Sequence, residues 1–393
     1  MGIKIKFLKS YVLPIAAVLT TSLASTSSFA VSADAMSASF PDKDQVLYPR
    51  VWTRSMWGAL AAHDTGSGTW RNYAYSGVTG GTDAFNESRN VERVFFIKDK
   101  KVATIKLNNG NASNIQMLPT GGSWWFIPSY EHSDVKAHRV SGNKIRVGAI
   151  NRFGQLCEWV SNTSGNFNAA PTCSGFSEYY PDSKIELYNG KFIALSNDRK
   201  AIKIGTPTNS RSYAIDNNRT ITTFATGSTR HSGSWISASS GRGVWLKKLS
   251  SGSFRRLRNV PNSPNGFVPT KLFMQETFFI PNISEKPSCS LMLTATNGNT
   301  SWIWRSSYTS DDFRCDGITL NENISWTKVL DVDGSDGFLP GYAQGPLNNI
   351  NPSPGPLFGS KLIGGWLSGG LVRIYSGDYR DLGQPPRPII IDL

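Results

Sequence analysis

Short apolar runs that end at a turn recur along the chain. Each run is five to seven residues long, is rich in β-branched or aromatic side chains, and stops at a cluster of Gly, Asn, Asp or Ser. This pattern is typical of β-hairpins, because strands favour such side chains and tight turns need residues that tolerate unusual backbone angles. The turns begin near residues 64, 108, 151, 197, 239, 297 and 368.

The spacing of these turns predicts the fold. Successive turns are separated by 44, 43, 46, 42, 58 and 71 residues. A period near 44 is the length of one four-stranded blade of a β-propeller. The sequence therefore predicts an all-β chain that forms a β-propeller of seven four-stranded blades, with six or eight blades as alternatives. A large β-sandwich or β-helix with accidental spacing is the competing architecture.

The C-terminal part of the chain predicts how the propeller closes. The apolar tail at 388–393 can form a strand, and we expect it to pair with the early run at 46–48, because propellers often complete one blade with strands from both termini. Pro and Gly predominate between Pro340 and Gly359, which predicts an irregular loop insertion. The loop belongs to a single predicted domain that spans residues 31–393.

Residues 1–30 have the features of a secretory signal peptide. Lys4, Lys6 and Lys9 precede an apolar stretch at 11–20, and Ser28 and Ala30 supply the small residues of a cleavage site. The apolar stretch is too short to cross a bilayer, so an uncleaved anchor is the weaker alternative. The sequence predicts a secreted or periplasmic protein without a transmembrane segment.

The composition fits an exported β protein. The 37 glycines, 21 prolines and 11% aromatic residues argue against a helical bundle or a coiled coil. In an exported chain, an even number of cysteines favours disulfides over thiol chemistry. We expect pairs between sequence neighbours, which is the simplest of the three possible connectivities: Cys157 with Cys173, and Cys289 with Cys315.

The charge balance suggests an affinity for polyanions. The chain has 41 Lys and Arg against 28 Asp and Glu, a formal net charge of +13. The basic residues are scattered, however, and no helix-turn-helix or zinc-finger spacing is present. We therefore expect a glycan or another surface polyanion as partner and no nucleic acid.

Acidic residues recur at a fixed distance before the turns. Counting back 19 to 21 residues reaches an acid in five of the seven units. Equivalent positions of a propeller are related by rotation about its axis, so these acids predict a ring that could hold sugar hydroxyls or a cation. The alternative is that each acid bonds to the backbone of its own blade. The five acids are Asp44, Glu87, Glu131, Glu178 and Glu276.

Two further clusters are candidates for ligand or metal binding. His132 follows Trp124 and Trp125, so this segment combines a titratable group with stacking surfaces. A second segment contains Asp331, Asp333 and Asp336 and is similar to an acidic calcium loop, although Asp336 stands where the EF-hand needs Gly. Calcium is the one candidate ion, and no other cofactor is expected.

Motifs of several common enzymes do not occur in the sequence. It contains no Gly-x-Ser-x-Gly elbow, no His-Glu-x-x-His and no phosphate-binding P-loop. We therefore expect a recognition protein that binds a glycan or another envelope or host-surface ligand on one propeller face, without covalent chemistry. A propeller glycosidase or polysaccharide lyase with paired carboxylates is the competing hypothesis, and a protein-binding scaffold is the third.

Overall fold

The computed structural model describes parts of the chain between residues 36 and 387. The chain divides between Ala30 and Val31 into two units, and every described residue belongs to the second unit. The predicted signal peptide lies outside the described residues, and for residues 271–383 the description covers the backbone. The described residues are 36–39, 50–55, 57–64, 66–88, 90–120, 131–188, 190–227, 235–249, 252–256, 271–279, 288–297, 300–309, 327–332, 339–342, 363–366, 372–375, 379–383 and 387.

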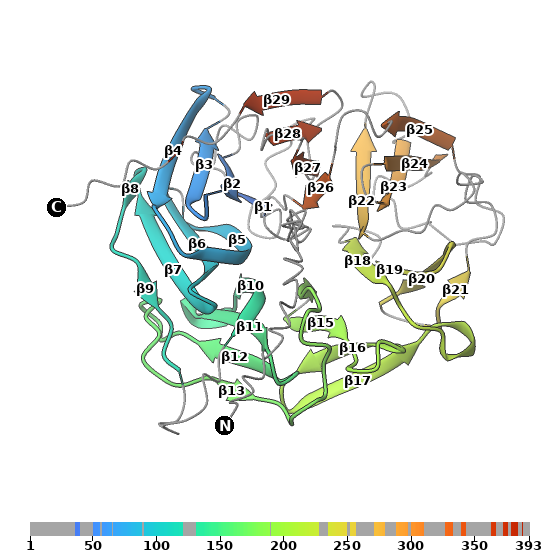
Figure 1. The fold of residues 1–393 in the computed structure, drawn as a ribbon, viewed down its shortest axis with the longest axis horizontal. Helices are drawn as coiled ribbons and strands as arrows, with labels where there is room; N and C mark the ends of the chain where they lie inside the picture. The colour runs from blue at the N-terminus through green and yellow to red at the C-terminus, as the bar shows by residue number, and fades with distance from the viewer. Residues whose placement is uncertain are drawn as a thin grey trace, which may run out of the picture. The chain divides into compact units, whose positions relative to one another are not determined.

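The described strands form antiparallel sheets of consecutive strands (Figure 1). The first sheet contains β1 (Met36–Ser39), β2 (Arg50–Arg54), β3 (Leu60–Asp64) and β4 (Thr69–Ala74). The second contains β5 (Val78–Ser88), β6 (Val91–Lys98), β7 (Lys101–Asn108) and β8 (Asn111–Ala112), and β9 (Gln116–Met117) also pairs with β7. The third contains β10 (His132–Arg139), β11 (Ile145–Asn151), β12 (Leu156–Val160) and β13 (Thr172–Cys173).

Four more described sheets follow, and each has four strands. The fourth contains β14 (Glu186–Tyr188), β15 (Lys191–Leu195), β16 (Ala201–Thr206) and β17 (Asn209–Ala214). The fifth contains β18 (Thr223–Gly227), β19 (Trp235–Ser240), β20 (Gly243–Lys248) and β21 (Arg255–Arg256). The sixth contains β22 (Lys271–Phe279), β23 (Ser288–Asn297), β24 (Thr300–Thr309) and β25 (Thr327–Val332). The seventh contains β26 (Leu339–Tyr342), β27 (Ile363–Trp366), β28 (Val372–Tyr375) and β29 (Tyr379–Gly383).

The fold is the predicted all-β class built of four-stranded antiparallel sheets, a β-propeller. The described helices are two short 3-10 turns, η1 (Ser141–Asn143) and η2 (Asp216–Asn218). The number of blades and the closing strand stay predictions, because residues 388–393 and their expected partner at 46–48 lie outside the described residues. Pro340, which we expected in an irregular loop, lies in β26, while residues 343–359 are outside the description.

All seven apolar runs before the predicted turns coincide with strands. They lie on β3, β7, β11, β15, β19, β23 and β27. Their place within a sheet differs, however. The run is the third strand in the first two sheets and the second strand in the other five. The repeat was therefore recognised correctly as hairpins. The strand that carries the run changes from the third to the second of its sheet between the second and the third sheet, and we call this shift the change of phase.

This change of phase places turns at opposite ends of neighbouring sheets. The first strands β5 and β10 run side by side in the same direction, because Gly80 lies against Ser133 near their starts and Arg139 donates to the carbonyl of Glu87 near their ends. A turn after a third strand and a turn after a second strand then lie at opposite ends. The regular spacing predicted equivalent turns, which would lie on one face of a propeller, and the turns near 108 and 151 do not.

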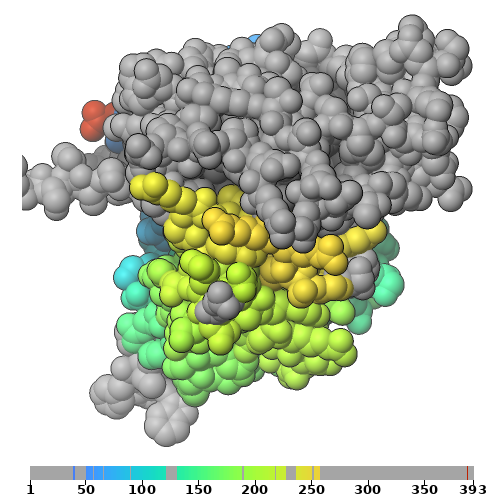
Figure 2. Space-filling view, turned by 90° about the vertical axis from the view of Figure 1, so that its right-hand side faces the viewer, coloured from blue at the N-terminus to red at the C-terminus, as the bar shows by residue number. Residues whose placement is uncertain are grey.

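Consecutive sheets pack face to face through apolar side chains. Trp52 and Phe96 belong to a buried cluster that joins the first two sheets, and Phe95 and Trp159 to one that joins the second and third. Similar clusters join the third sheet to the fourth and the fourth to the fifth. Figure 2 shows yellow residues of the fifth sheet lying directly against green residues of the fourth. Burial of these faces supplies the main driving force for folding.

Buried carboxylates connect the first strands of neighbouring sheets. Asp83 of β5 accepts a hydrogen bond from the backbone N–H of Ala137 in β10 at 2.7 Å. Asp134 of β10 accepts one from the N–H of Ile185, next to β14, at 2.9 Å. Both carboxylates are buried. A buried carboxylate that lost such donors would be costly, so these bonds fix how the first strands sit beside one another.

Arginine–glutamate pairs occur in the first three sheets. Arg50, at the start of β2, pairs with Glu92 of the second sheet. Arg146, near the start of β11, pairs with Glu158 of its own sheet, and Arg93 of β6 pairs with a carboxylate at the end of β5. The side chains are largely withdrawn from solvent. Buried pairs of this kind hold sheets in one arrangement, because a broken pair leaves an uncompensated charge.

Gly148 of β11 allows the fourth sheet to approach the third closely. A Cβ atom at this position would overlap the ring of Phe192 in β15. We expect Gly148→Ala to lower the free energy of unfolding by about 1–3 kcal/mol, because overpacking forces neighbouring groups to shift. Urea denaturation of the purified protein measures this loss.

The matching control is a double-mutant cycle with Phe192→Leu. A smaller side chain at 192 makes room for the new methyl group, so the double variant should lose less stability than the two single variants together. Additive losses would contradict the proposed contact.

Candidate functional site

Two of the predicted ring acids lie at opposite ends of their sheets. Glu87 is near the end of β5, where it pairs with Arg93 and lies 3.3 Å from the Nζ atom of Lys106. Glu131 directly precedes β10, and its carboxylate lies 2.9 Å from the Nζ atom of Lys100. Because β5 and β10 run in the same direction, the two acids do not occupy equivalent positions. A ring that contains both of them is therefore excluded. The count of 19 to 21 residues before each turn reaches opposite sheet ends, because one turn follows a third strand and the other a second strand.

Several other predicted site residues lie outside the description. Glu276 and Asp331 are on β22 and β25, where the description covers the backbone alone, and the remaining residues lie outside the described ranges. Their roles, and calcium binding, stay predictions. Within the described ranges, no group of three metal-ligating side chains is present. The residues outside the description are Asp44, Trp124, Trp125, Asp333, Asp336 and Cys315, together with the side chain of Cys289.

His132 lies in the core between sheets. Its side chain is 5% exposed, and its ring meets that of Trp159 edge to face at 5.6 Å. A β-bulge between His132 and Val135 turns His132 to the face that packs on the second sheet. Burial lowers the pKa of His132 to about 4, so the imidazole is neutral at physiological pH. The structure thus places His132 in the core, whereas the sequence made it a candidate for ligand or metal binding.

Glu178 lies on an ordered surface loop between β13 and β14. Its carboxylate accepts a hydrogen bond from the N–H of Gly175 at 3.0 Å and lies 2.6 Å from the Nζ atom of Lys203. Phe176, two residues earlier, is 71% exposed. Among the described residues, four large apolar side chains are exposed, and Phe176 is the most exposed of them.

The exposed ring of Phe176 belongs to a cluster of aromatic and charged side chains. It meets the ring of Phe153 edge to face at 6.0 Å. The guanidinium of Arg152 lies 4.8 Å from the Phe153 centroid. On the adjoining turn after β15, Arg199 lies 5.3 Å from the ring centroid of Tyr180. We call this cluster the Phe176 surface; it comprises Arg152, Phe153, Phe176, Glu178, Tyr180 and Arg199.

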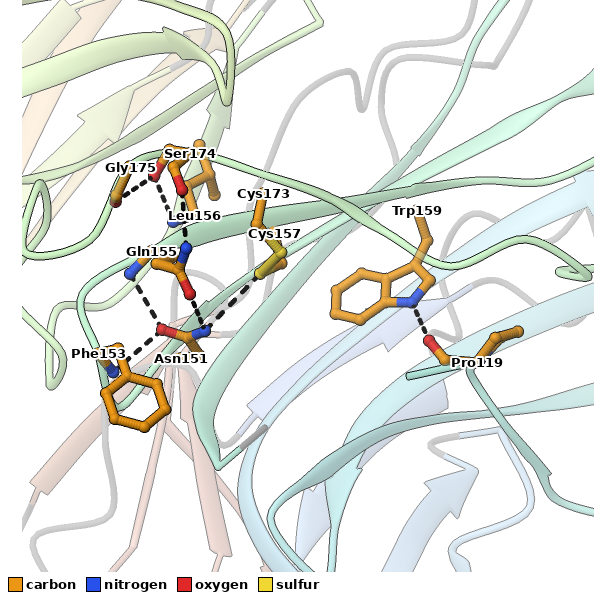
Figure 3. Close-up of a disulfide and its surroundings, with 10 residues drawn as sticks. All are labelled: Pro119, Asn151, Phe153, Gln155, Leu156, Cys157, Trp159, Cys173, Ser174 and Gly175. Carbon is orange, nitrogen blue, oxygen red and sulfur yellow. Dashed lines mark hydrogen bonds between the residues drawn. A yellow bond between two sulfur atoms is a disulfide. The ribbon is translucent and has the colours of Figure 1, made fainter. Parts of the chain in front are cut away.

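Asn151 shapes the turn that carries Phe153 (Figure 3). Its Oδ1 atom accepts hydrogen bonds from the N–H groups of Phe153 and Gln155, both at 3.0 Å. Its Nδ2 atom donates to Oε1 of Gln155 at 3.0 Å. An Asn side chain that satisfies the backbone in this way stabilises a tight turn. The ring of Phe153 is therefore held at the end of the hairpin.

A disulfide fixes the strand that leads into the Phe176 loop. Cys157 of β12 and Cys173 of β13 face each other in register and are bonded, as the sequence predicted. Directly after the disulfide, Ser174 accepts a hydrogen bond from Nε2 of Gln155 at 2.8 Å on its carbonyl and one from the N–H of Leu156 at 3.1 Å on Oγ (Figure 3). The loop therefore leaves the sheet from a fixed point.

The loop is also bonded along its length to the turn that carries Phe153. The N–H of Ser177 donates to the carbonyl of Phe153 at 2.8 Å, and the N–H of Tyr179 donates to that of Gly154 at 2.9 Å. Gly154 has φ +68°, and a Cβ atom there would overlap the carbonyl oxygen of Tyr179. Only glycine satisfies both conditions. The two aromatic rings are thus held together by backbone bonds, a glycine and a disulfide.

The basic and acidic groups of the Phe176 surface are paired unequally. Glu178 is neutralised by Lys203, and Asp198 is bound by its own turn through Ser196 Oγ at 2.6 Å. That bond, together with the N–H of residue 200, lowers the pKa of Asp198, so it stays ionised. Within the described part of the chain, no carboxylate lies within 4 Å of the guanidinium of Arg152 or of Arg199. The arrangement can therefore stack on an apolar ring face and bind acceptor groups beside it.

The sequence pointed to part of this surface. Glu178 was identified as one of the recurring acids, and the local disulfide was predicted. Phe153 and Arg199 were missed, because they lie on hairpin turns 23 residues before and after Phe176 and no motif connects them. Recognising that these turns flank one loop requires the order of the sheets.

The buried His132 makes stability sensitive to acid. Its folded pKa of about 4 lies below the ordinary 6.5, so its stabilising contribution is complete above about pH 6.5 and is lost as the pH falls toward 4. The loss from this group approaches about 3 kcal/mol. We expect urea denaturation to show that His132→Phe loses less stability than the parent protein between pH 7 and pH 4.5. Equal losses would contradict the assignment.

The disulfide supports both the sheet and the Phe176 loop. Because it closes a loop with a sequence separation of 16 residues, replacing Cys157 and Cys173 by Ser should lower the free energy of unfolding by about 3 kcal/mol. Thermal unfolding with and without reductant measures this effect. Reductant should lower the unfolding temperature of the parent protein by breaking this disulfide. The double variant lacks the bond, so reductant has no effect on it at this site.

Comparison with known proteins shows the fold. No protein-family model and no curated protein sequence matches the chain. BP39L lectin from Burkholderia pseudomallei is similar in structure, with a TM-score of 0.57 and 13% sequence identity over 90% of this chain and 98% of the lectin. A streptogramin B lyase has a TM-score of 0.49 at 12% identity, covering 87% of this chain and 90% of the lyase. A lectin of Aleuria aurantia in complex with Fucα1-6GlcNAc has a TM-score of 0.45 at 12% identity, covering 80% and 98%.

Proposed function

We propose that this protein is an exported recognition protein that binds a glycan at the Phe176 surface without covalent chemistry. One observation carries the proposal: a 71% exposed phenylalanine on a loop that a disulfide, a glycine and backbone bonds hold in place. Transfer of a phenylalanine ring from water to an apolar contact lowers the free energy of the system. A fixed and exposed ring is therefore typical of a binding surface.

The chemistry of the Phe176 surface suits a sugar. The face of an aromatic ring is apolar and carries partial negative charge, which matches the C–H groups on one face of a pyranose. The hydroxyl groups at the edge of the same sugar need donors and acceptors. Arg152 and Arg199 offer donors, and Glu178, with 36% of its side chain exposed, offers an acceptor.

The state of the carboxylates supports binding over catalysis. A glycosidase needs two carboxyl groups that face each other across a bond, one of them available as an acid. Glu178 is paired with Lys203, and Asp198 is held by its own turn. Neither carboxylate is set up to donate a proton. The similarity in fold to a lectin with a TM-score of 0.57 supports recognition as the function.

The bonded cysteines support an exported protein. Disulfides persist in oxidising compartments such as the periplasm and the extracellular space. The segment at 1–30 has the charge and hydropathy pattern of a signal peptide. Within the described residues, no helix is long and apolar enough to span a membrane. We therefore propose a secreted or periplasmic location.

The test replaces the exposed ring. We expect Phe176→Ala to weaken binding at least tenfold to every glycan that the parent protein binds on an array, because the stacking surface is removed. The stability of the variant should stay within about 0.5 kcal/mol of the parent, since the ring is mostly in solvent. Titration calorimetry with the best array glycan and urea denaturation measure the two quantities.

Tyr75→Ala is the matched control, because Tyr75 is also an exposed aromatic residue, at 57%, and lies in the first half of the chain on another loop. It should leave binding unchanged. If Phe176→Ala binds normally, or if both variants lose binding equally, the Phe176 surface is not the binding site.

A further inference from the structure

We infer that the ligand of the Phe176 surface is an acidic glycan, whose carboxylate or sulfate groups are bound by Arg152 and Arg199. This inference rests on the proposed function and specifies its ligand class. It is based on which charged groups around the ring of Phe176 have partners among the described residues.

Arg152 provides the first cationic group. It is exposed and follows Asn151, whose side chain fixes the turn. Its guanidinium lies 4.8 Å from the ring centroid of Phe153, which in turn meets Phe176. A guanidinium that stacks on an aromatic ring still has N–H groups that point outward in the guanidinium's own plane, where they can donate to an anion.

Arg199 provides the second cationic group, on the other side of the Phe176 loop. The N–H of Asn197 donates to the carbonyl of Glu178 at 3.2 Å, which joins the turn of Arg199 to that loop. Arg199 itself has φ +57°. This backbone conformation favours Gly or Asn, so an arginine here carries a conformational cost.

The acids of the same surface do not neutralise these two groups. Glu178 is compensated by Lys203 at 2.6 Å, and Asp198 accepts bonds from Ser196 and from the N–H of Lys200. Among the side chains that the structure describes, no carboxylate pairs with either guanidinium, so both can bind an external anion. A bidentate contact between guanidinium and carboxylate or sulfate is the strong form of this interaction.

The rest of the chain agrees with an anionic ligand. Its formal net charge is +13, or +10 without residues 1–30, which contain three Lys and no acid, and this charge raises the local concentration of polyanions around the protein. A neutral glycan would gain nothing from this charge. An acidic polysaccharide combines the two features that the Phe176 surface offers, because it presents apolar ring faces and regularly spaced anions.

The experiment compares ligands that differ only in charge. The parent protein is screened on an array that pairs uronate, sialylated and sulfated glycans with their neutral counterparts, and is then titrated with polygalacturonate and with its methyl-esterified form. We expect binders to be the acidic members of the pairs, with affinity at least tenfold weaker in 500 mM than in 50 mM NaCl, since salt screens exposed charges.

Variants test the two arginines directly. Arg152→Gln and Arg199→Gln should each weaken binding of the best acidic glycan about tenfold, the effect expected when a charge-assisted contact is lost. The controls are Arg71→Gln and Arg211→Gln, which remove exposed arginines from the outer strands β4 and β17. They should change binding less than twofold. If test and control variants lose the same affinity, the effect comes from net charge alone, and the inference is wrong.

The outcomes separate the two proposals. If neutral glycans bind as well as acidic ones and Phe176→Ala abolishes both, the proposed function stands and the acidic ligand class is wrong. If no glycan binds while vesicles of anionic phospholipid or single-stranded nucleic acid bind in a Phe176-dependent way, both proposals are wrong. If the acidic glycans bind but Phe176→Ala retains affinity, the Phe176 surface is not their site.

Discussion

Both faces of the central sheets are apolar, and this constraint determines the rest of the structure. A sheet with two apolar faces cannot leave either of them in water, so each one must be covered by the next sheet. The clusters around Phe96, Phe95 and Phe192 meet this need at three successive interfaces. Stacking brings the first strands together, and the buried carboxylates of Asp83 and Asp134 then bond to the neighbouring backbone. With the faces covered, the exposed ring of Phe176 is carried by a loop at a sheet end.

The sequence predicted the hairpins well but not their phase. A tight turn has a strong local signal, because Gly, Asn and Asp tolerate its backbone angles, and all seven runs are strands. The same signal does not tell whether a turn follows the second or the third strand of a sheet. For this reason Glu87 and Glu131 were assigned equivalent positions, although they lie at opposite sheet ends. Neighbouring sheets settle the phase, and their contacts are long range.

Side-chain direction was the other feature that local sequence could not supply. The bulge between His132 and Val135 adds one residue to β10, and it reverses which side chains point to the second sheet. His132, which the sequence made a candidate ligand-binding residue, therefore lies against Trp159. The disulfide between Cys157 and Cys173 was predictable, because a hairpin brings residues of small sequence separation into register. Local features were thus accessible from the sequence, and features that depend on an adjacent sheet were not.

Rigidity explains why the Phe176 surface is suited to recognition. A flexible loop loses conformational entropy when it binds, whereas a loop fixed beforehand keeps that free energy for the ligand. The Cys157–Cys173 bond and Gly154 fix the loop in the free protein, and Arg199 is fixed by its turn. An exposed ring and two fixed cationic groups then present one geometry to solvent. On the proposed function, such a surface would select ligands by the spacing between an apolar face and its anions, without a covalent step.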